Sequence, residues 1–214
     1  MDMVENLLKD IKIPRMVKAR QVFPRPIIKD VGLAVREELK SKNLLSLIKP
    51  GQTVAVSAGS RGIANFPAII RETVRCIKSA GGIPFIFPAM GSHGGATAEG
   101  QEDMLRGMGI TEETVEAPIR ASMEVIKIGE SENGLPAYID KFAYEADAIV
   151  ILNRIKPHVA FRGKYESGLM KMVTIGMGKQ KGADTCHNLG FGKMAENIPA
   201  IAKVILAKTN LLFA

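Results

Sequence analysis

The sequence is dominated by short apolar runs, each of which ends in a loop of small, polar or basic residues. Three of these runs, at 53–56, 83–88 and 148–152, are rich in Val, Ile and Phe, as the buried strands of a parallel sheet are. A segment with apolar residues at helical spacing follows each loop. Strands that alternate with helices predict an α/β fold, Rossmann-like, with a mostly parallel sheet and helices on both faces.

Other segments predict elements outside this alternation. Helical spacing predicts helices over 2–10, 30–40, 97–108 and 194–208, with Thr97 as an N-cap. A turn at 131–134 joins two predicted strands, 123–128 and 135–139. Partial alternation predicts an edge strand at 16–23, closed by Pro24 and Pro26. The chain ends in an apolar run at 210–214. We therefore expect residues 1–214 to be one domain, the N-terminal half of a two-domain protein.

Bulk composition excludes several classes of protein. The chain has 214 residues, 46% hydrophobic and 24% charged, and no apolar run approaches the roughly 18–20 residues of a membrane span. The first six residues are acidic and lack a signal-peptide pattern, so we expect a cytoplasmic protein without membrane contact. Two cysteines are too few for a disulfide scaffold. No Trp and 5% aromatics leave no stacking platform for nucleic acid.

Positive charge is concentrated in one stretch. Between 154 and 181 there are seven Lys and Arg residues and one acid, Glu166, so this stretch carries +6 of the chain's net +7. It follows the predicted strand at 148–152. A basic excess after a buried strand indicates an anion site at the carboxyl edge of an open α/β sheet.

The three loops that follow the predicted strands carry Arg61, His93 and His158. In a parallel sheet such loops share one edge, where ligands bind. A single loop histidine is more often structural than functional, but all three histidines, His187 included, lie in or beside these loops. Arg61 could bind a carboxylate or phosphate through its guanidinium group. A structural interpretation, in which it is a surface arginine beside a turn, is nearly as good. The histidine spacing lacks a strong zinc signature.

Two further features have both a functional and a structural interpretation. Residues 59–62, Gly-Ser-Arg-Gly, could cradle a phosphate with backbone amides, although glycine is also the usual turn residue. Lys171 lies among Leu169, Met170 and Met172. Such a lysine is either desolvated and nucleophilic or extends past the apolar residues to solvent.

Four motifs together resemble the N-terminal domain of the nickel-dependent lactate racemase family. They are GSRGIAN (59–65), PAMGSHGGATAEGQ (88–101), NRIKPH (153–158) and ESGLMKM (166–172). The resemblance runs from about residue 10 to the end. It implies an isomerase, a racemase or epimerase of 2-hydroxy acids, that uses a nickel-pincer mononucleotide as hydride acceptor. It also implies dependence on cofactor-synthesis proteins.

The resemblance assigns roles residue by residue. Arg61 contributes to the substrate's anion site, and His93 and His158 exchange protons with the substrate hydroxyl. Lys171 carries the cofactor as a thioamide, with Lys164 and Lys179 as the next candidates, and Gly59 and Ser60 belong to the cofactor-binding loop. His187 is the metal ligand, because the family's metal histidine also follows its lysine by sixteen residues.

Some features depart from the family's pattern. Its lactate racemases carry an aspartate three residues before the arginine, where this chain has Ala58, which indicates a 2-hydroxy acid other than lactate. The second domain of the family is absent from this chain, which leaves open that the isolated domain is inactive. The alternative function is a non-catalytic α/β domain that binds a phosphorylated or carboxylated small ligand through its basic loops.

Overall fold

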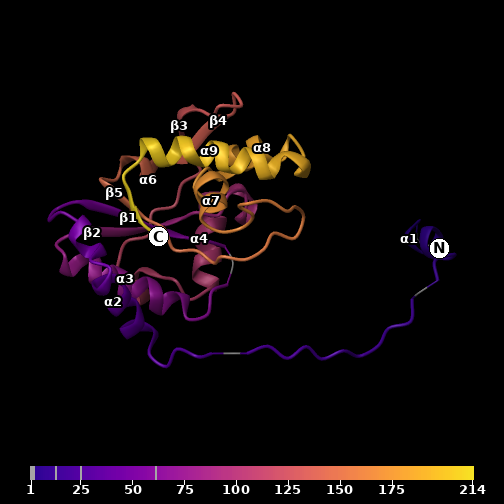
Figure 1. Cartoon of the computed structure of the whole chain (residues 1–214), viewed down its shortest axis with the longest axis horizontal. Helices are drawn as coiled ribbons and strands as arrows, with labels where there is room; N and C mark the ends of the chain where they lie inside the picture. The colour runs from indigo at the N-terminus through magenta and orange to yellow at the C-terminus, as the bar shows by residue number, and fades with distance from the viewer. Residues whose placement is uncertain (1–2, 13, 25, 61) are drawn as a thin grey trace.

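A four-stranded parallel sheet forms the centre of the protein (Figure 1). The computed structural model describes residues 3–12, 14–24, 26–60 and 62–214. Its strands are β1 (Thr53–Ala58), β2 (Ile83–Pro88), β5 (Ala148–Val150) and β6 (Leu211–Phe213). The order across the sheet is β2-β1-β5-β6, so the chain moves to one side of β1 for β2 and to the other side for β5. Loops after β1 and β5 therefore diverge, which opens a crevice at the carboxyl edge.

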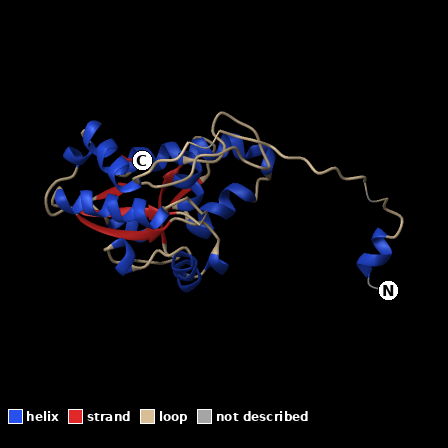
Figure 2. Cartoon of the chain, turned by 90° about the horizontal axis from the view of Figure 1, so that it is seen from below, coloured by secondary structure: helices blue, strands red, loops and turns tan. Residues whose placement is uncertain are grey.

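Alternate residues of the strands point to opposite faces of the sheet, and each face has its own core. Val54 and Val56 belong to one apolar cluster, and Ala55 belongs to the other. Every described residue of β1 from Val54 to Ala58 is buried. Because the sheet is buried on both faces, its strands appear in the sequence as continuous apolar runs. Figure 2 shows the strands enclosed between helices.

Helices α2 to α5 lie on the side of the sheet that Val54 and Val56 line, with α2 and α5 packed against α3. Their bounds are α2 (Val31–Ser41), α3 (Phe66–Ser79), α4 (Ala98–Gly107) and α5 (Glu112–Val115), with short 3₁₀ turns η1 (Leu44–Leu47) and η2 (Gly94–Ala96). The Asp30 carboxylate caps α2 by accepting from the Leu33 amide at 2.9 Å. Thr97 caps α4 in the same way, accepting from Gly100 at 3.0 Å. These caps satisfy amides that have no partner within the helix.

The opposite face is covered by the C-terminal half of the chain. It comprises the antiparallel hairpin β3 (Val125–Glu130) and β4 (Pro136–Asp140), α6 (Lys141–Glu145), α7 (Leu169–Lys171), the π-helical segment η3 (Met172–Gly176), α8 (Lys179–His187), η4 (Phe191–Lys193) and α9 (Met194–Lys208). In α9 the buried side chains include Ile198, Ile201 and Ile205, which face the sheet at helical spacing.

The structure confirms the α/β class, the parallel sheet and the helices on both faces. It overturns the edge strand expected at 16–23, because residues 14–24 contain no strand. A strand needs a neighbour to share its hydrogen bonds, and this segment runs away from the sheet toward α1 (Met3–Leu8), as Figure 1 shows. Both cysteines are free and buried. No helix in the described part of the chain is long and apolar enough to span a bilayer.

Candidate active site

A cavity of about 460 Å³ lies at the carboxyl ends of β1, β2 and β5. Its walls come from the three loops that follow these strands and from the helical stretch α7–η3–α8. The position follows from the strand order, since the loops after β1 and β5 separate there. Ligands of open α/β sheets bind at such a point, and the volume lies within the roughly 300–1,000 Å³ of ordinary ligand pockets.

Six of the seven residues that the sequence singled out line this one cavity. They are Gly59, Ser60, His93, His158, Lys171 and His187. Arg61, the seventh, lies outside the described residues. Residues separated by more than a hundred positions in sequence thus meet at one edge of the sheet, as parallel strands require.

His93 follows β2 and is exposed toward the cavity. The Ser60 hydroxyl lies 2.5 Å from His93 Nδ1, so the loop after β1 meets the loop after β2 through this contact. A hydrogen bond at one ring nitrogen limits both the rotation of the ring and the tautomer it adopts. Ser60 thus orients the His93 ring at the cavity wall.

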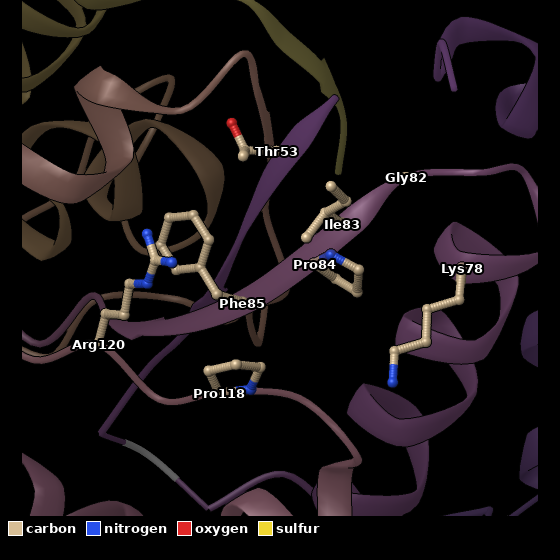
Figure 3. Close-up of a pocket in the computed structure, with 8 residues that line it drawn as sticks. All are labelled: Thr53, Lys78, Gly82, Ile83, Pro84, Phe85, Pro118 and Arg120. Atoms are coloured by element: carbon tan, nitrogen blue, oxygen red, sulfur yellow. The ribbon is translucent and has the colours of Figure 1, made fainter. Parts of the chain in front are cut away.

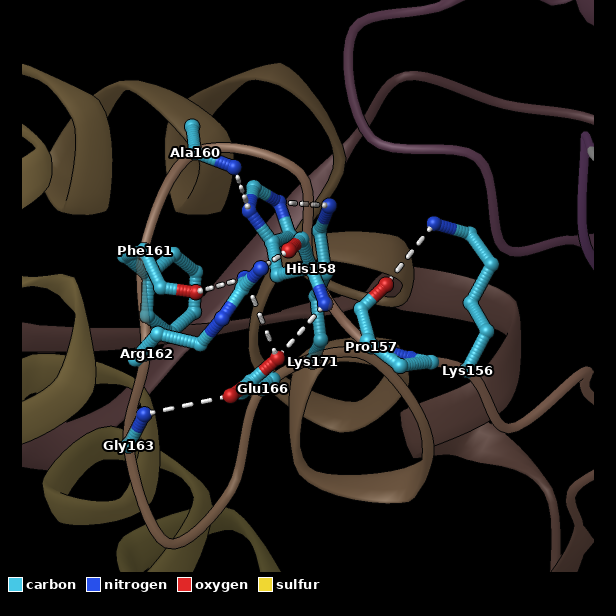
Figure 4. Close-up of polar contacts among 9 residues, drawn as sticks. All are labelled: Lys156, Pro157, His158, Ala160, Phe161, Arg162, Gly163, Glu166 and Lys171. Carbon is cyan, nitrogen blue, oxygen red and sulfur yellow. Dashed lines mark hydrogen bonds and ion pairs between the residues drawn. The ribbon is translucent and has the colours of Figure 1, made fainter.

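His158 follows β5 and, in contrast, is only 7% exposed. Its backbone amide donates to the Glu166 carboxylate at 2.7 Å, its carbonyl accepts from the Arg162 guanidinium, and its ring lies 4.4 Å from the Phe161 ring. Figure 4 shows the segment 157–166 as a loop that curves around the imidazole, with Glu166 and Arg162 bonded to its backbone. His158 is therefore held by its own loop.

Lys171, the last residue of α7, reaches the other side of this ring, with Nζ 3.1 Å from His158 Nε2 (Figure 4). The Ala160 amide donates to Nδ1 at 3.1 Å, so the hydrogen of a neutral ring is on Nε2. An ammonium group has no lone pair to accept that hydrogen. A charged Lys171 can therefore donate to Nε2 only in the other tautomer of the neutral ring, which carries its hydrogen on Nδ1.

Desolvation and nearby charges favour the neutral forms of His158 and His187. Burial lowers the pKa of His158, and the positive charges of Lys171 and Lys156 lower it further. Burial and then Lys171 likewise lower the pKa of His187. A neutral imidazole can accept a proton or bind a metal, whereas the imidazolium can do neither.

The helical stretch that carries Lys171 is irregular. Met172–Gly176 forms a π-helix between α7 and α8, although the spacing of apolar residues predicted an ordinary helix. A Cβ at Gly176 would lie 2.8 Å from the Ala89 carbonyl oxygen, so a glycine allows the π-helix to approach the end of β2 closely. Widened turns of this kind are frequent at functional sites.

Sequence reasoning missed the polar residues beneath the cavity. Gln101 and Asp140 are fully buried, as is Lys179, and the three are linked through the Lys179 amine. Glu166, which holds the His158 loop, was noted only as the single acid of a basic stretch. A glutamine inside a helix carries no signal of burial. The one hint was Lys179, a charged residue directly after the run Ile175–Gly178.

A second hollow, of about 310 Å³, lies beside the edge strand β2, near the amino ends of β1 and β2 (Figure 3). Its surface is mostly apolar, and the Arg120 guanidinium lies 4.5 Å from the Phe85 ring centroid. The charged residues among the described ones that line it are Lys78 and Arg120, and none of the residues singled out from the sequence is there.

Comparison with known proteins points to one family. Residues 7–198 match the family model described as the lactate racemase N-terminal domain. The lactate racemase apoprotein from Thermoanaerobacterium thermosaccharolyticum superimposes with a TM-score of 0.55 at 18% sequence identity, over 85% of this chain and 47% of that chain. This chain therefore spans about half the length of that structure, and the likeness shows a shared fold. No curated protein matches the chain.

Proposed function

The chain belongs to the lactate racemase N-terminal domain family, and we propose that it forms the cofactor-binding half of a racemase or epimerase of 2-hydroxy acids. The observation that carries this proposal is the convergence of Lys171 and all three histidines on one cavity. A structural role explains one loop histidine, but it does not explain three histidines and a lysine around the same space.

The residues present fit a nickel-pincer mononucleotide. Lys171 offers an amine for a covalent tether, and His187 offers a neutral imidazole, a good ligand for nickel. The described residues hold no group of three or more His, Cys, Asp or Glu that could bind a metal ion. A nickel ion at His187 would therefore need its remaining ligands from a cofactor. When bound, this cofactor supplies a hydride acceptor, which protein side chains do not provide.

The chain's own residues then handle the proton and the charge of the substrate. His93 and His158 come from loops on either side of β1, so we assign them the transfer of the substrate's hydroxyl proton from two directions. Each must be neutral to accept that proton, and the lowered pKa of His158 favours this form. Arg61, Arg154 and Lys156 are basic residues of the same loops that can attract a carboxylate.

The position of Ala58 supports a substrate other than lactate. Ala58 is fully buried at the end of β1 and lies in the apolar cluster on the α3 face. It adds no carboxylate to the cavity wall. An interaction that the family's lactate racemases make through an aspartate here is therefore replaced or absent, and we propose a different 2-hydroxy acid as the substrate.

Separate loss of the tether and of the metal tests this function. In full-length protein produced together with the cofactor-synthesis proteins, Lys171→Ala should abolish the adduct in intact-mass spectra. His187→Ala should keep the adduct mass but lose bound nickel, because one ligand of the metal is gone. Lys164→Ala, which removes an exposed lysine of the 157–166 loop, is the control and should keep both.

Two results would contradict the proposal. An adduct that persists on Lys171→Ala would show that the tether is elsewhere. Wild-type protein that acquires neither adduct nor nickel under these conditions would favour the second candidate, a domain that binds an anionic small ligand. Arg154 and Lys156 at the cavity wall support that candidate, and it predicts salt-sensitive binding of phosphorylated or carboxylated compounds.

A further inference from the structure

A buried polar cluster lies directly beneath the loop that carries His93. Its members are Lys179 from the start of α8, Gln101 from α4 and Asp140 from the end of β4, all with 0% exposure. None of the three lines the cavity. Burial lowers the pKa of Lys179 and raises that of Asp140, because each charged form loses its water. Burying the charged groups of Lys179 and Asp140 costs free energy, so their contacts need an explanation.

Lys179 makes two hydrogen bonds and one ion pair. Its Nζ donates to the carbonyl of Pro88, the last residue of β2, and to Gln101 Oε1 at 3.0 Å. It also lies 3.0 Å from Asp140 Oδ2, an oxygen that accepts no hydrogen bond from the described residues, so Asp140 offsets the charge of Lys179 as an ion pair. Lys179 therefore joins the end of β2, helix α4 and the hairpin at one point.

Lys179 also fixes which way the Gln101 amide points. Because Oε1 accepts from Lys179, Nε2 faces the other way, toward the loop. There it donates to the carbonyls of Gly91, at 2.9 Å, and His93, at 3.2 Å. Both amide hydrogens are used, and both are used on the backbone of the His93 loop.

The same loop is pressed against α4 by two glycines. Gly94 adopts a φ of +64°, and a Cβ on Gly100 would lie 2.0 Å from the Gly94 carbonyl oxygen. Side chains at these positions would push the loop away from the helix. Gln101, one residue after Gly100, is thereby within reach of the His93 carbonyl.

We propose that Lys179 and Gln101 are positioning residues for His93, and that they hold the 91–96 loop at one place on the cavity wall. Asp140 retains the charge of Lys179, Lys179 orients Gln101, and Gln101 holds the carbonyls on both sides of Ser92. The inference rests on the proposed function only for the proton-transfer role of His93. The restraint on the loop can be measured by a method that does not depend on enzyme activity.

Hydrogen exchange of three loop amides tests the restraint in the 214-residue chain. The amides of Gly91, His93 and Ala96 donate to the carbonyls of Gly176, Met90 and His93. Gln101→Glu keeps an acceptor for Lys179 but removes both donors to the loop. It should speed exchange of these amides by about tenfold or more, because the loop opens locally. Gln101→Met removes both sets of contacts and should do the same.

Gln180→Glu is the matched control, because it makes the same chemical change at an exposed glutamine beside Lys179. It should leave exchange in the loop unchanged. A folded Gln101→Glu protein whose loop amides exchange at the wild-type rate would overturn the proposal.

A kinetic comparison then links the loop to His93 in the cofactor-loaded, full-length enzyme. Gln101→Glu should lower kcat about 10–100-fold, the cost of a small misplacement of a catalytic group, with KM little changed. In a His93→Gln background the same change should have almost no further effect on the residual turnover. A full additional loss in that background would overturn positioning through His93. Faster loop exchange with an unchanged kcat would support the restraint and contradict the proposed role of His93.

Discussion

Lys171 and Lys179 are eight residues apart in the same helical stretch, and their surroundings in the sequence are alike. Each follows small or apolar residues, and each was a candidate tether. Lys171 lines the cavity and lies against a histidine ring. Lys179 is buried among three oxygen acceptors from three different elements. The first is accessible from the cavity, and the second is held away from it.

The difference shows that burial alone does not activate a lysine. Desolvation disfavours the charged form of Lys179, but the Pro88 and Gln101 oxygens and the Asp140 carboxylate stabilise its ammonium. Lys171 instead has the Nε2 ring nitrogen of His158 at 3.1 Å. The partner atoms of Lys179 therefore hold it as a structural cation.

Stability should separate the two lysines most strongly. Lys179→Met leaves Asp140 buried without its partner, and it should reduce the free energy of unfolding by about 3–5 kcal/mol. Lys171→Met, at a partly exposed position, should change it by about 1 kcal/mol or less. Urea denaturation followed by circular dichroism measures both. Adding Asp140→Asn to Lys179→Met should recover part of the loss, and equal losses for the two single variants would break the comparison.

Chemical reactivity should separate them next. An amine-reactive acylating reagent at neutral pH should modify Lys171 at least about tenfold faster than Lys179, because Lys179 becomes accessible only when its region opens. Peptide mass spectrometry after a short exposure measures the ratio. The exposed Lys164 serves as the reference for an unhindered amine. Modification of Lys179 at the rate of Lys164 would show that its three contacts do not persist in solution.

Removing the Lys171 charge should move the histidine titrations in one direction. Lys171 lowers the pKa of His158 and of His187, so Lys171→Met should raise both midpoints measured by NMR. Lys179 is not among the groups that shift either pKa, and a charge-keeping Lys179→Arg variant should leave both midpoints unchanged. Midpoints that do not move in Lys171→Met would show that Lys171 carries little positive charge in the titration range.

The smallest expected effect is on the pH dependence of stability. His158 has a lowered pKa in the folded state, so the unfolded chain binds more protons once the pH falls below an ordinary histidine pKa of about 6.5. Folding should therefore become less favourable as the pH falls from that value through the folded pKa. Urea midpoints between neutral pH and pH 5 measure the slope. Lys171→Met should flatten it, and a steeper slope would contradict this account of the histidine.

The local sequence determined most of the elements and the edge that carries the site. Continuous apolar runs predicted strands at 53–56 and 83–88, where β1 and β2 lie, and Thr97 marked the start of α4 because a cap is a contact between near neighbours. The polar residues after each strand predicted the shared cavity, since parallel strands leave no other place for those loops. The strand predicted at 16–23 was wrong, because alternation alone does not supply a partner strand, and the spacing that predicted an ordinary helix did not show the π-helix at Met172–Gly176.

Only the tertiary structure decided how the site is supported. Gln101 meets its partners because α4 packs on the His93 loop, and Lys179 meets Asp140 because the hairpin lies under α8. Each of these contacts joins elements whose relative placement depends on the strand order and on both cores. The sequence thus determined which chemical groups reach the cavity, through hydrogen bonding and burial that act over a few residues. Long-range packing decided which lysine lines the cavity and which is buried, because the partner atoms named above for both lysines lie on other segments.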